Sequence, residues 1–465
     1  MTDDERPTYN PPMPTWDPSL SDAERYPLMT GEARTFLNGL REHPQAPVFN
    51  HVCGDRLDAP AVARIRAWEA GLNTEPAAWR HGEIPAWLSE FAARCVAQVP
   101  FYRRQGGRPG AFFDLPLCDR GDLSGATWAF VPDDAPLDQI ILYSTSGTTG
   151  HPLDVPWTPE GASMYLPLLR RAARLHGSDL AGGSGRTAIA LVCFQKRTFT
   201  LAQLSFFLDG AGHVKINLDP DAWRDPDDRA AYLNALDPEI YTGDPISFEA
   251  LAALPVRARP QALISSSMAL LPGLKAALAT RFGCPVIDVY STNETGPIAA
   301  DAPDGAGHAL LQNRLYIEIL DPDGAPCPPG TRGEIVVSGG FNPMLPLLRY
   351  RTGDMASLDF GPDGRSPRLV GLEGRAPVVF ADAFGAPVNN IEVSQAVRPF
   401  ALSQWTLRQH ADKSLTLRYR GEGVDEAALR RALEGLFGPL AVLRIERARL
   451  LEKVRQYTRE YVSDD

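Results

Sequence analysis

The sequence predicts an α/β fold in which a large first domain, with parallel-rich sheets and a β-rich subdomain, precedes a small α+β cap domain. Strand-like and helical segments alternate from about residue 84 onward, as they do in layered α/β proteins. Two extended segments flank a turn sequence at 321–324, which indicates a strand pair in a smaller sheet. After Gly374 the order strand, strand, helix, strand predicts a compact second unit. The predicted domains are therefore residues 1–374 and 375–465.

The individual elements follow from apolar periodicity and from the position of proline and glycine. Apolar residues recur at helical spacing over 84–98, and Pro100 predicts the end of that helix because proline lacks the amide donor. The residues before about 85 carry no recognisable motif. The pattern predicts strands at 139–143, 188–194, 286–290, 314–320 and 333–337, and helices at 165–175 and 271–282. In the second domain it predicts strands at 405–409, 414–419 and 441–446 and a helix at 425–437.

Composition limits the classes of function. The 465 residues are 44% hydrophobic and 22% charged, and no run of about 18 apolar residues is present to span a membrane. Residues 1–16 are acidic and proline-rich and lack the features of a secretory signal, so we expect a cytoplasmic protein without a membrane partner. The net charge of −11 argues against nucleic acid as a partner. The 6 cysteines lack zinc-ligand spacing, so free buried thiols are expected.

A segment rich in hydroxyl groups and glycine follows the strand predicted at 139–143. Glycines allow the backbone to approach a phosphate closely, and hydroxyls and amides donate hydrogen bonds to it. The segment lacks the lysine pattern of a Walker loop, and a polar linker is the alternative interpretation. Its position directly after an apolar strand favours a phosphate-binding loop formed by Ser144, Thr145, Ser146, Gly147, Thr148, Thr149 and Gly150.

Two further segments carry residues suited to a nucleotide. At 288–297 a strand end presents Tyr290 and Ser291, followed by Glu294, so that an aromatic ring could stack on a base and a carboxylate could hold Mg²⁺. At 348–354, Asp354 follows a glycine and could accept hydrogen bonds from the two hydroxyls of a ribose. Each segment alone is also compatible with an ordinary solvated residue or turn.

The order of these segments, with 371–375 and a late Lys453, resembles the adenylate-forming superfamily of acyl- and aryl-coenzyme A ligases, nonribosomal adenylation domains and luciferases. Residues 99–103, 114–117 and 136–139 are similar to the phenylacetate:coenzyme A ligase branch of that superfamily. The resemblance covers about residue 84 to the C-terminus.

The resemblance implies a role for each matching residue. The 144–150 loop would hold the ATP phosphates, Ser265, Ser266 and Tyr290 would lie at the adenine, and Asp354 would bind the ribose. Glu294 would bind Mg²⁺ and contribute to catalysis. Arg375 matches the arginine before the hinge between the domains, and Lys453 matches the lysine that bridges the substrate carboxylate and the α-phosphate. Four positions depart from the family pattern, namely His151, Asn293, Pro377 at the hinge and Glu452.

The implied reaction is ATP-dependent activation of a carboxylic acid as its acyl-AMP, followed by transfer to coenzyme A, with ATP, Mg²⁺ and coenzyme A as cofactors. An amine, a hydroxyl or a carrier-protein thiol is the alternative acceptor, and a non-catalytic nucleotide-binding protein is the third possibility. Aromatic and apolar residues at 193–207 and 241–246 favour an aromatic acid. The predicted acid pocket comprises Phe194, Phe199, Tyr241 and Gly243, and the protein would act as a monomer or homodimer.

Overall fold

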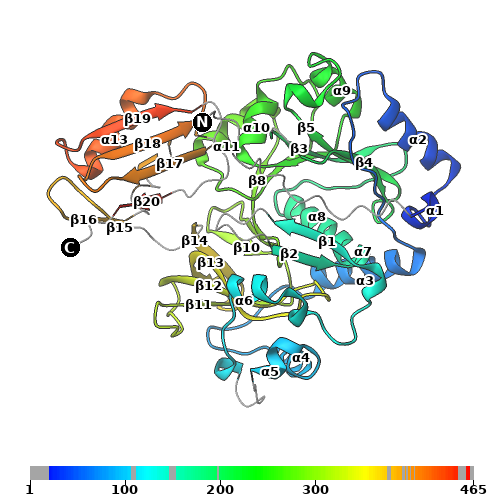
Figure 1. Ribbon diagram of the computed structural model, residues 1–465, viewed down its shortest axis with the longest axis horizontal. Coiled ribbons are helices and arrows are strands. Elements are labelled where there is room, and N and C mark those ends of the chain that lie inside the picture. Colours follow the sequence, from blue (N-terminus) through cyan, green and yellow to red (C-terminus); the bar gives the residue numbers. More distant parts are fainter. Residues whose placement is uncertain are drawn as a thin grey trace, which may run out of the picture.

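The computed structural model shows a large α/β part and a smaller C-terminal α+β part that lies beside it (Figure 1). The structure describes residues 20–105, 112–145, 153–195, 198–373, 379–389, 393, 396–397, 399–402, 404–448 and 457–460. In the part of the chain so described, no helix is long and apolar enough to cross a membrane.

One twisted sheet runs through the large part, and its first half is mainly parallel. The strand order there is β8-β7-β6-β3-β5-β4, with β4 antiparallel at the edge. Strands buried on both faces read as nearly continuous apolar runs, as β3 and β7 do. The strands are β3 (Thr187–Cys193), β4 (Leu201–Ser205), β5 (Ala211–Asn217), β6 (Ile240–Gly243), β7 (Ala262–Ser265) and β8 (Val286–Thr292).

The second half of the sheet is antiparallel and forms the predicted β-rich subdomain. Its order is β11-β12-β13-β14-β10-β9, and β9 pairs with β8 to join the two halves. β1 (Ile141–Thr145) and β2 (Leu153–Trp157) form a separate antiparallel pair. The remaining strands are β9 (Gly296–Asp301), β10 (His308–Leu310), β11 (Leu315–Leu320), β12 (Arg332–Gly339), β13 (Leu347–Phe360) and β14 (Pro367–Glu373).

Helices cover both faces of the parallel half. The longer ones are α2 (Gly31–Glu42), α3 (Ala59–Thr74), α8 (Tyr165–Leu175), α9 (Asp228–Leu236), α10 (Pro245–Ala252) and α11 (Pro272–Phe282). One hydrophobic core packs α2, α9, α10 and α11 against one face, and a second packs α3 and α8 against the other. The other helices before the C-terminal part are α4 (Ala86–Gln98) and the short α1 (Asp22–Arg25), α5 (Pro100–Arg104), α6 (Arg120–Gly125) and α7 (Pro159–Ser163).

The helix predicted at 84–98 is present as α4, but the chain does not leave the helical conformation for long. Pro100 stands at the first position of α5, where the missing amide would have no helical partner. The proline therefore ends one helix and begins the next. All 6 cysteines are free, as expected, but Cys53 and Cys284 are only partly buried.

The C-terminal part has its own hydrophobic core beneath a four-stranded sheet of order β19-β18-β17-β20. A two-stranded pair, β15 (Val379–Ala381) with β16 (Pro387–Asn389), precedes it. The sheet contains β17 (Gln404–Gln409), β18 (Leu415–Arg420), β19 (Leu443–Arg447) and β20 (Tyr457–Arg459), and α13 (Glu426–Phe437) packs on it. Each strand and the helix predicted after residue 400 is present. The predicted domain boundary falls at the undescribed residues 374–378 and stays a prediction.

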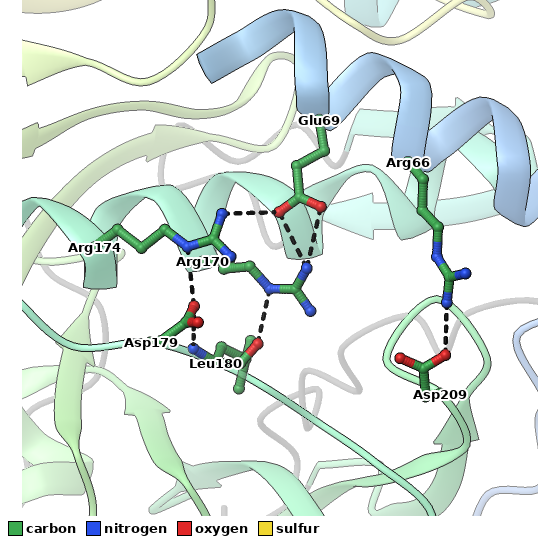
Figure 2. A network of polar contacts seen from close by, with 7 residues as sticks. All are labelled: Arg66, Glu69, Arg170, Arg174, Asp179, Leu180 and Asp209. Atoms are coloured by element: carbon green, nitrogen blue, oxygen red, sulfur yellow. Dashed lines mark hydrogen bonds and ion pairs between the residues drawn. The ribbon is translucent and has the colours of Figure 1, made fainter. Parts of the chain in front are cut away.

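A polar network ties α3 to α8 on the outside of the large part (Figure 2). Glu69 of α3 accepts hydrogen bonds from Arg170 at 3.1 Å and lies 3.6 Å from Arg174, both on α8. Arg170 also packs over the ring of Phe207, 4.9 Å from its centroid. The network links the two helices that pack against one face of the sheet.

Candidate functional site

The predicted adenine and acid residues meet where the parallel strands end. Gly243 on β6 is in register with Ser265 on β7, which is in register with Asp288 on β8. The amide of Ser266 donates a hydrogen bond to the Gly243 carbonyl at 2.9 Å. Because β6, β7 and β8 are parallel, their carboxyl ends lie at one edge of the sheet, the usual location of ligands in open α/β sheets.

Glu294 follows β8 and is buried, with 4% of its surface exposed. Arg120 Nη1 donates to Glu294 Oε1 at 2.9 Å, and the Tyr350 hydroxyl donates to the same oxygen at 3.0 Å. Burial and the neighbouring Glu294 carboxylate raise the pKa of Tyr350 above its usual range, so the phenol stays protonated and remains a donor. The two donors share one oxygen and orient the carboxylate.

A short backbone bridge explains why Arg120 and Tyr350 meet at Glu294. The Cys118 amide donates to the Arg349 carbonyl at 3.1 Å, and the Arg351 amide donates to the Cys118 carbonyl at 2.8 Å. This bridge holds the start of α6 alongside β13, so that Arg120 and Tyr350 come from neighbouring backbone segments.

Tyr290 and Asp354 are brought together directly. The Tyr290 hydroxyl donates to Asp354 Oδ2 at 2.9 Å, although the two residues are 64 positions apart. Burial raises the pKa of Tyr290 well above its usual range, with a further contribution from the Asp354 carboxylate, so this phenol also stays protonated. Asp354 lies within the long strand β13, which corrects the alternative of an ordinary turn. The predicted base and ribose residues are thus neighbours.

The turn that presents Glu294 is held rigidly. Gln312 Nε2 donates to the carbonyls of Thr295 and Pro297 at 2.8 and 2.7 Å, and the hydroxyls of Thr292 and Thr295 lie 2.7 Å apart. Gly296 has φ of +68°, and a Cβ there would lie 2.6 Å from the Phe341 ring. Only glycine fits this position without rearrangement. Ser291, beside this turn, hydrogen-bonds the Tyr165 side chain.

The residues predicted for the acid pocket separate into two environments. Phe194 and Phe199 follow β3, where the Arg420 guanidinium lies 5.1 Å from the Phe194 ring and Lys215 Nζ lies 3.3 Å from the Phe199 ring. Tyr241 is 0% exposed and packs in the helix-covered core, its ring 6.4 Å from that of Phe282. The structure does not place Tyr241 beside Phe199, and the assignment of both to one pocket stays a prediction.

Several predicted site residues lie outside the described part of the chain. These are Ser146, Gly147, Thr148, Thr149 and Gly150 of the phosphate loop, Arg375 and Pro377 at the hinge, and Lys453. Ser144 and Thr145 belong to β1, which places the start of the loop at the end of a strand. The roles assigned to these residues stay predictions.

Sequence reasoning missed Arg120 and Tyr350, the two donors to Glu294. Tyr350 stands inside a segment that was recognised for its aspartate, so its position in that segment was an available signal. Arg120 lies 174 residues from Glu294, and no local pattern marks such a contact.

Glu294 suits Mg²⁺, which favours carboxylate oxygens and is commonly held by one or two carboxylates together with substrate phosphates. Arg120 and Tyr350 both donate to Oε1 of Glu294 and so fix the orientation of the carboxylate. Among the described residues no cluster of three or more His, Cys, Asp or Glu side chains could enclose a metal by itself. The arrangement fits an ion shared with a bound polyphosphate.

The model of the AMP-binding enzyme family matches residues 114–344. The chain is 25% identical over 303 residues to the phenylacetate-coenzyme A ligase of Escherichia coli (strain K12), covering 60% of this chain and 67% of that protein. It is 24% identical to the phenylacetate-coenzyme A ligase of Aromatoleum evansii, covering 60% and 66%. The chain thus spans about two thirds of these relatives.

A solved structure of 2-hydroxyisobutyryl-CoA ligase in the postadenylation state, in complex with R3-HIB-AMP, is similar in fold. It aligns with a TM-score of 0.61 at 18% identity and covers 80% of this chain and 88% of that chain. The predicted fold, a large α/β domain of adenylate-forming type followed by a small α+β part, is confirmed by this likeness and by the observed sheets.

Proposed function

Because the chain belongs to the adenylate-forming AMP-binding enzymes, on their phenylacetate-coenzyme A ligase-like branch, we propose that it is an AMP-forming acid–thiol ligase. It activates a carboxylic acid with ATP as the acyl-AMP and transfers the acyl group to coenzyme A. One observation carries this proposal. The Tyr290–Asp354 pair and the buried Glu294 converge at the carboxyl edge of the parallel strands, within and beside the segment that matches the family.

The described residues have different roles in the proposed first half-reaction. Tyr290 offers an aromatic face for the base and holds Asp354 through its hydroxyl, so that the carboxylate is oriented to accept from the ribose hydroxyls. Glu294 would hold Mg²⁺, which neutralises phosphate charge during displacement. Arg120 and Tyr350 keep that carboxylate in one orientation.

Electrostatics explains why such a constellation is needed. The substrate carboxylate and the α-phosphate are both anionic, and in a water-poor site their repulsion amounts to several kcal/mol. In the proposed reaction a carboxylate oxygen bonds to the α-phosphorus and pyrophosphate leaves. The coenzyme A thiol then attacks the acyl carbon, loses its proton, and AMP leaves. Lys453 and the 144–150 loop are proposed to supply the remaining cationic and donor groups in the first step.

The finer proposal concerns the acid. Phe194 and Phe199 lie next to the carboxyl end of β3, and both present rings that a flat apolar substrate could pack against. The phenylacetate-coenzyme A ligases among the relatives support an aromatic acid for this chain.

The test is acid-dependent exchange of labelled pyrophosphate into ATP, followed by mass spectrometry of the product with coenzyme A present. Phenylacetate and its ring-substituted analogues are expected to support exchange and to give a thioester. Exchange without a thioester would replace coenzyme A by an amine, hydroxyl or carrier-protein acceptor. Absence of exchange with aromatic and aliphatic acids alike would refute the adenylation itself.

A further inference from the structure

Lys215 is a half-buried cation near the carboxyl end of β5. Val214 and Ile216 point into the helix-covered core, so Lys215 and His213 point to the opposite face of the sheet. Lys215 Nζ lies 3.3 Å from the centroid of the Phe199 ring. Among the described residues no carboxylate lies within ion-pair distance of Lys215, which is unusual because withdrawing a charge from water is costly without a partner.

A hydrogen-bond chain fixes His213 as a second donor on that face. The Cys53 thiol donates to Gln203 Oε1 at 3.1 Å, and Gln203 Nε2 faces His213 Nδ1 at 3.4 Å. Since the amide nitrogen can only donate, Nδ1 accepts and the proton of the neutral ring resides on Nε2. Burial lowers the pKa of His213 to about 4, so the ring is neutral near pH 7. Both β5 side chains therefore present donors.

The residues around this pair are held in place by the N-terminal segment, which had no assigned role. The Thr200 amide donates to Asn50 Oδ1 at 2.8 Å, and the His51 amide donates to the Thr200 carbonyl at 3.0 Å. These bonds position Phe199, whose ring packs 5.5 Å from that of His51. The aromatic residue and the two donors form one fixed surface next to the end of β3.

The location connects this surface to the candidate site. Lys215 is in register with Leu191 on β3, and β3 in turn neighbours β6, which ends at Gly243. Two strand spacings separate β5 from β6, a distance of about 10 Å. A small acid whose carboxylate is activated beyond the end of β6 can therefore extend its other end towards β5.

We propose that Lys215, with His213, recognises an anionic or hydrogen-bond-accepting oxygen at the end of the acid remote from the carboxylate that is activated. The preferred substrate is then an aromatic acid with a carboxylate or hydroxyl substituent on its ring, packed against Phe199. This inference rests on the proposed function and specifies its substrate class. Two donors and no nearby acidic partner select an acceptor and disfavour a cationic substituent.

The experiment compares kcat/KM for pyrophosphate exchange with phenylacetate, 4-hydroxyphenylacetate, 4-carboxyphenylacetate, 4-(aminomethyl)phenylacetate and adipate. The wild-type protein is expected to prefer the hydroxy and carboxy compounds over phenylacetate by roughly tenfold to a hundredfold, the range for a hydrogen bond to a charged group. The aminomethyl compound is expected to be the poorest ring acid. Equal use of all the ring acids by the wild type would overturn the inference without needing any variant.

Variants test whether Lys215 causes the preference for hydroxy- and carboxy-substituted acids. Lys215→Met is expected to lower the ratio of kcat/KM for 4-carboxyphenylacetate over phenylacetate at least tenfold, and Lys215→Arg to retain part of it. The control Lys413→Met removes an exposed lysine of the C-terminal part and should leave the ratio unchanged. Circular dichroism checks that the Lys215→Met variant is folded. If the folded variant keeps the wild-type ratio of kcat/KM, Lys215 only packs against its neighbours and the proposal is refuted.

The outcomes also separate this inference from the proposed function. If adipate is preferred over the ring acids and the preference requires Lys215, the cation site stands and the aromatic ring in the proposed function is wrong. If some acids support exchange but substituents have no effect, the ligase stands and this inference fails. If no acid supports exchange, both fail.

Discussion

Glu294 Oε1 lies 2.9 Å from Arg120 Nη1, so the carboxylate proposed to hold Mg²⁺ is also an ion-pair partner. The arginine side chain is 31% exposed and the glutamate side chain 5% exposed. A partly exposed arginine side chain thus contacts a buried carboxylate. We interpret Arg120 as a positioning residue that keeps the Glu294 carboxylate in one orientation before ATP binds.

Glu294→Gln is expected to reduce the rate of pyrophosphate exchange strongly and to raise the Mg²⁺ concentration needed for half-maximal exchange, because a neutral amide is a poorer Mg²⁺ ligand. A magnesium titration of the exchange rate measures this. Arg120→Lys, which retains a cation near Glu294, serves as the comparison and should shift the midpoint less. An unchanged midpoint in Glu294→Gln would remove the metal role.

Asp354→Ala is expected to weaken ATP binding by about 1.5–3 kcal/mol, since it removes a charged acceptor for the ribose hydroxyls. Isothermal titration calorimetry with ATP measures the change. Tyr290→Phe is the matched control, because it removes only the hydroxyl that donates to Asp354 and keeps the ring. Its effect should be smaller. ATP affinity equal to the wild type in Asp354→Ala would argue against the ribose assignment.

Arg420 joins the C-terminal part to the large part, and we predict that this contact stabilises the observed arrangement. Its Nε lies 2.6 Å from Glu249 Oε2 on α10, and each side chain is 13% exposed. Arg420→Glu should expand the molecule in small-angle X-ray scattering, because it places two carboxylates together, and the added change Glu249→Arg should restore the wild-type radius of gyration.

The control for this exchange is Arg447→Glu, which disrupts an exposed pair with Glu422 inside the C-terminal part. Exposed pairs contribute little, so no expansion is expected. If the doubly reversed protein stays as expanded as the Arg420→Glu protein, the ion pair is not what holds the two parts.

Lys215 should make the free energy of unfolding depend on pH in the alkaline range. Burial lowers its pKa from 10.5 to about 8. Between these values the unfolded chain binds the proton and the native protein does not, so stability rises with pH across about 8 to 10.5. At 1.36 kcal/mol per pKa unit, the penalty at neutral pH is about 3 kcal/mol.

Lys215→Met should therefore be more stable than the wild type at pH 7.5, and the difference should shrink by pH 9.5. Urea denaturation at the two pH values measures both free energies. Lys413→Met, which changes an exposed lysine, should track the wild type at both. A difference that does not change with pH would show that Lys215 is not a desolvated cation.

The sequence alone determined the parts of this protein that depend on local pattern. Buried strands read as apolar runs, and Tyr290, Glu294 and Asp354 could be recognised because each stands at a fixed offset from a strand or a glycine in its own segment. Parallel strands bring their carboxyl ends to one edge, but β6 and β7 were not among the predicted strands, so the shared location of Gly243 and Ser265 came from the tertiary structure.

The tertiary structure decided which side chains share an environment. Arg120 reaches Glu294 across 174 residues, and Arg420 reaches Glu249 across 171. Tyr241 on β6 and Lys215 on β5 illustrate the same limit within one sheet, because Tyr241 points into the core formed with α2, α9, α10 and α11 and Lys215 points to the opposite face. Whether a lysine keeps a carboxylate partner depends on the packing of distant segments, and hydrophobic periodicity along the chain contains no information about that packing.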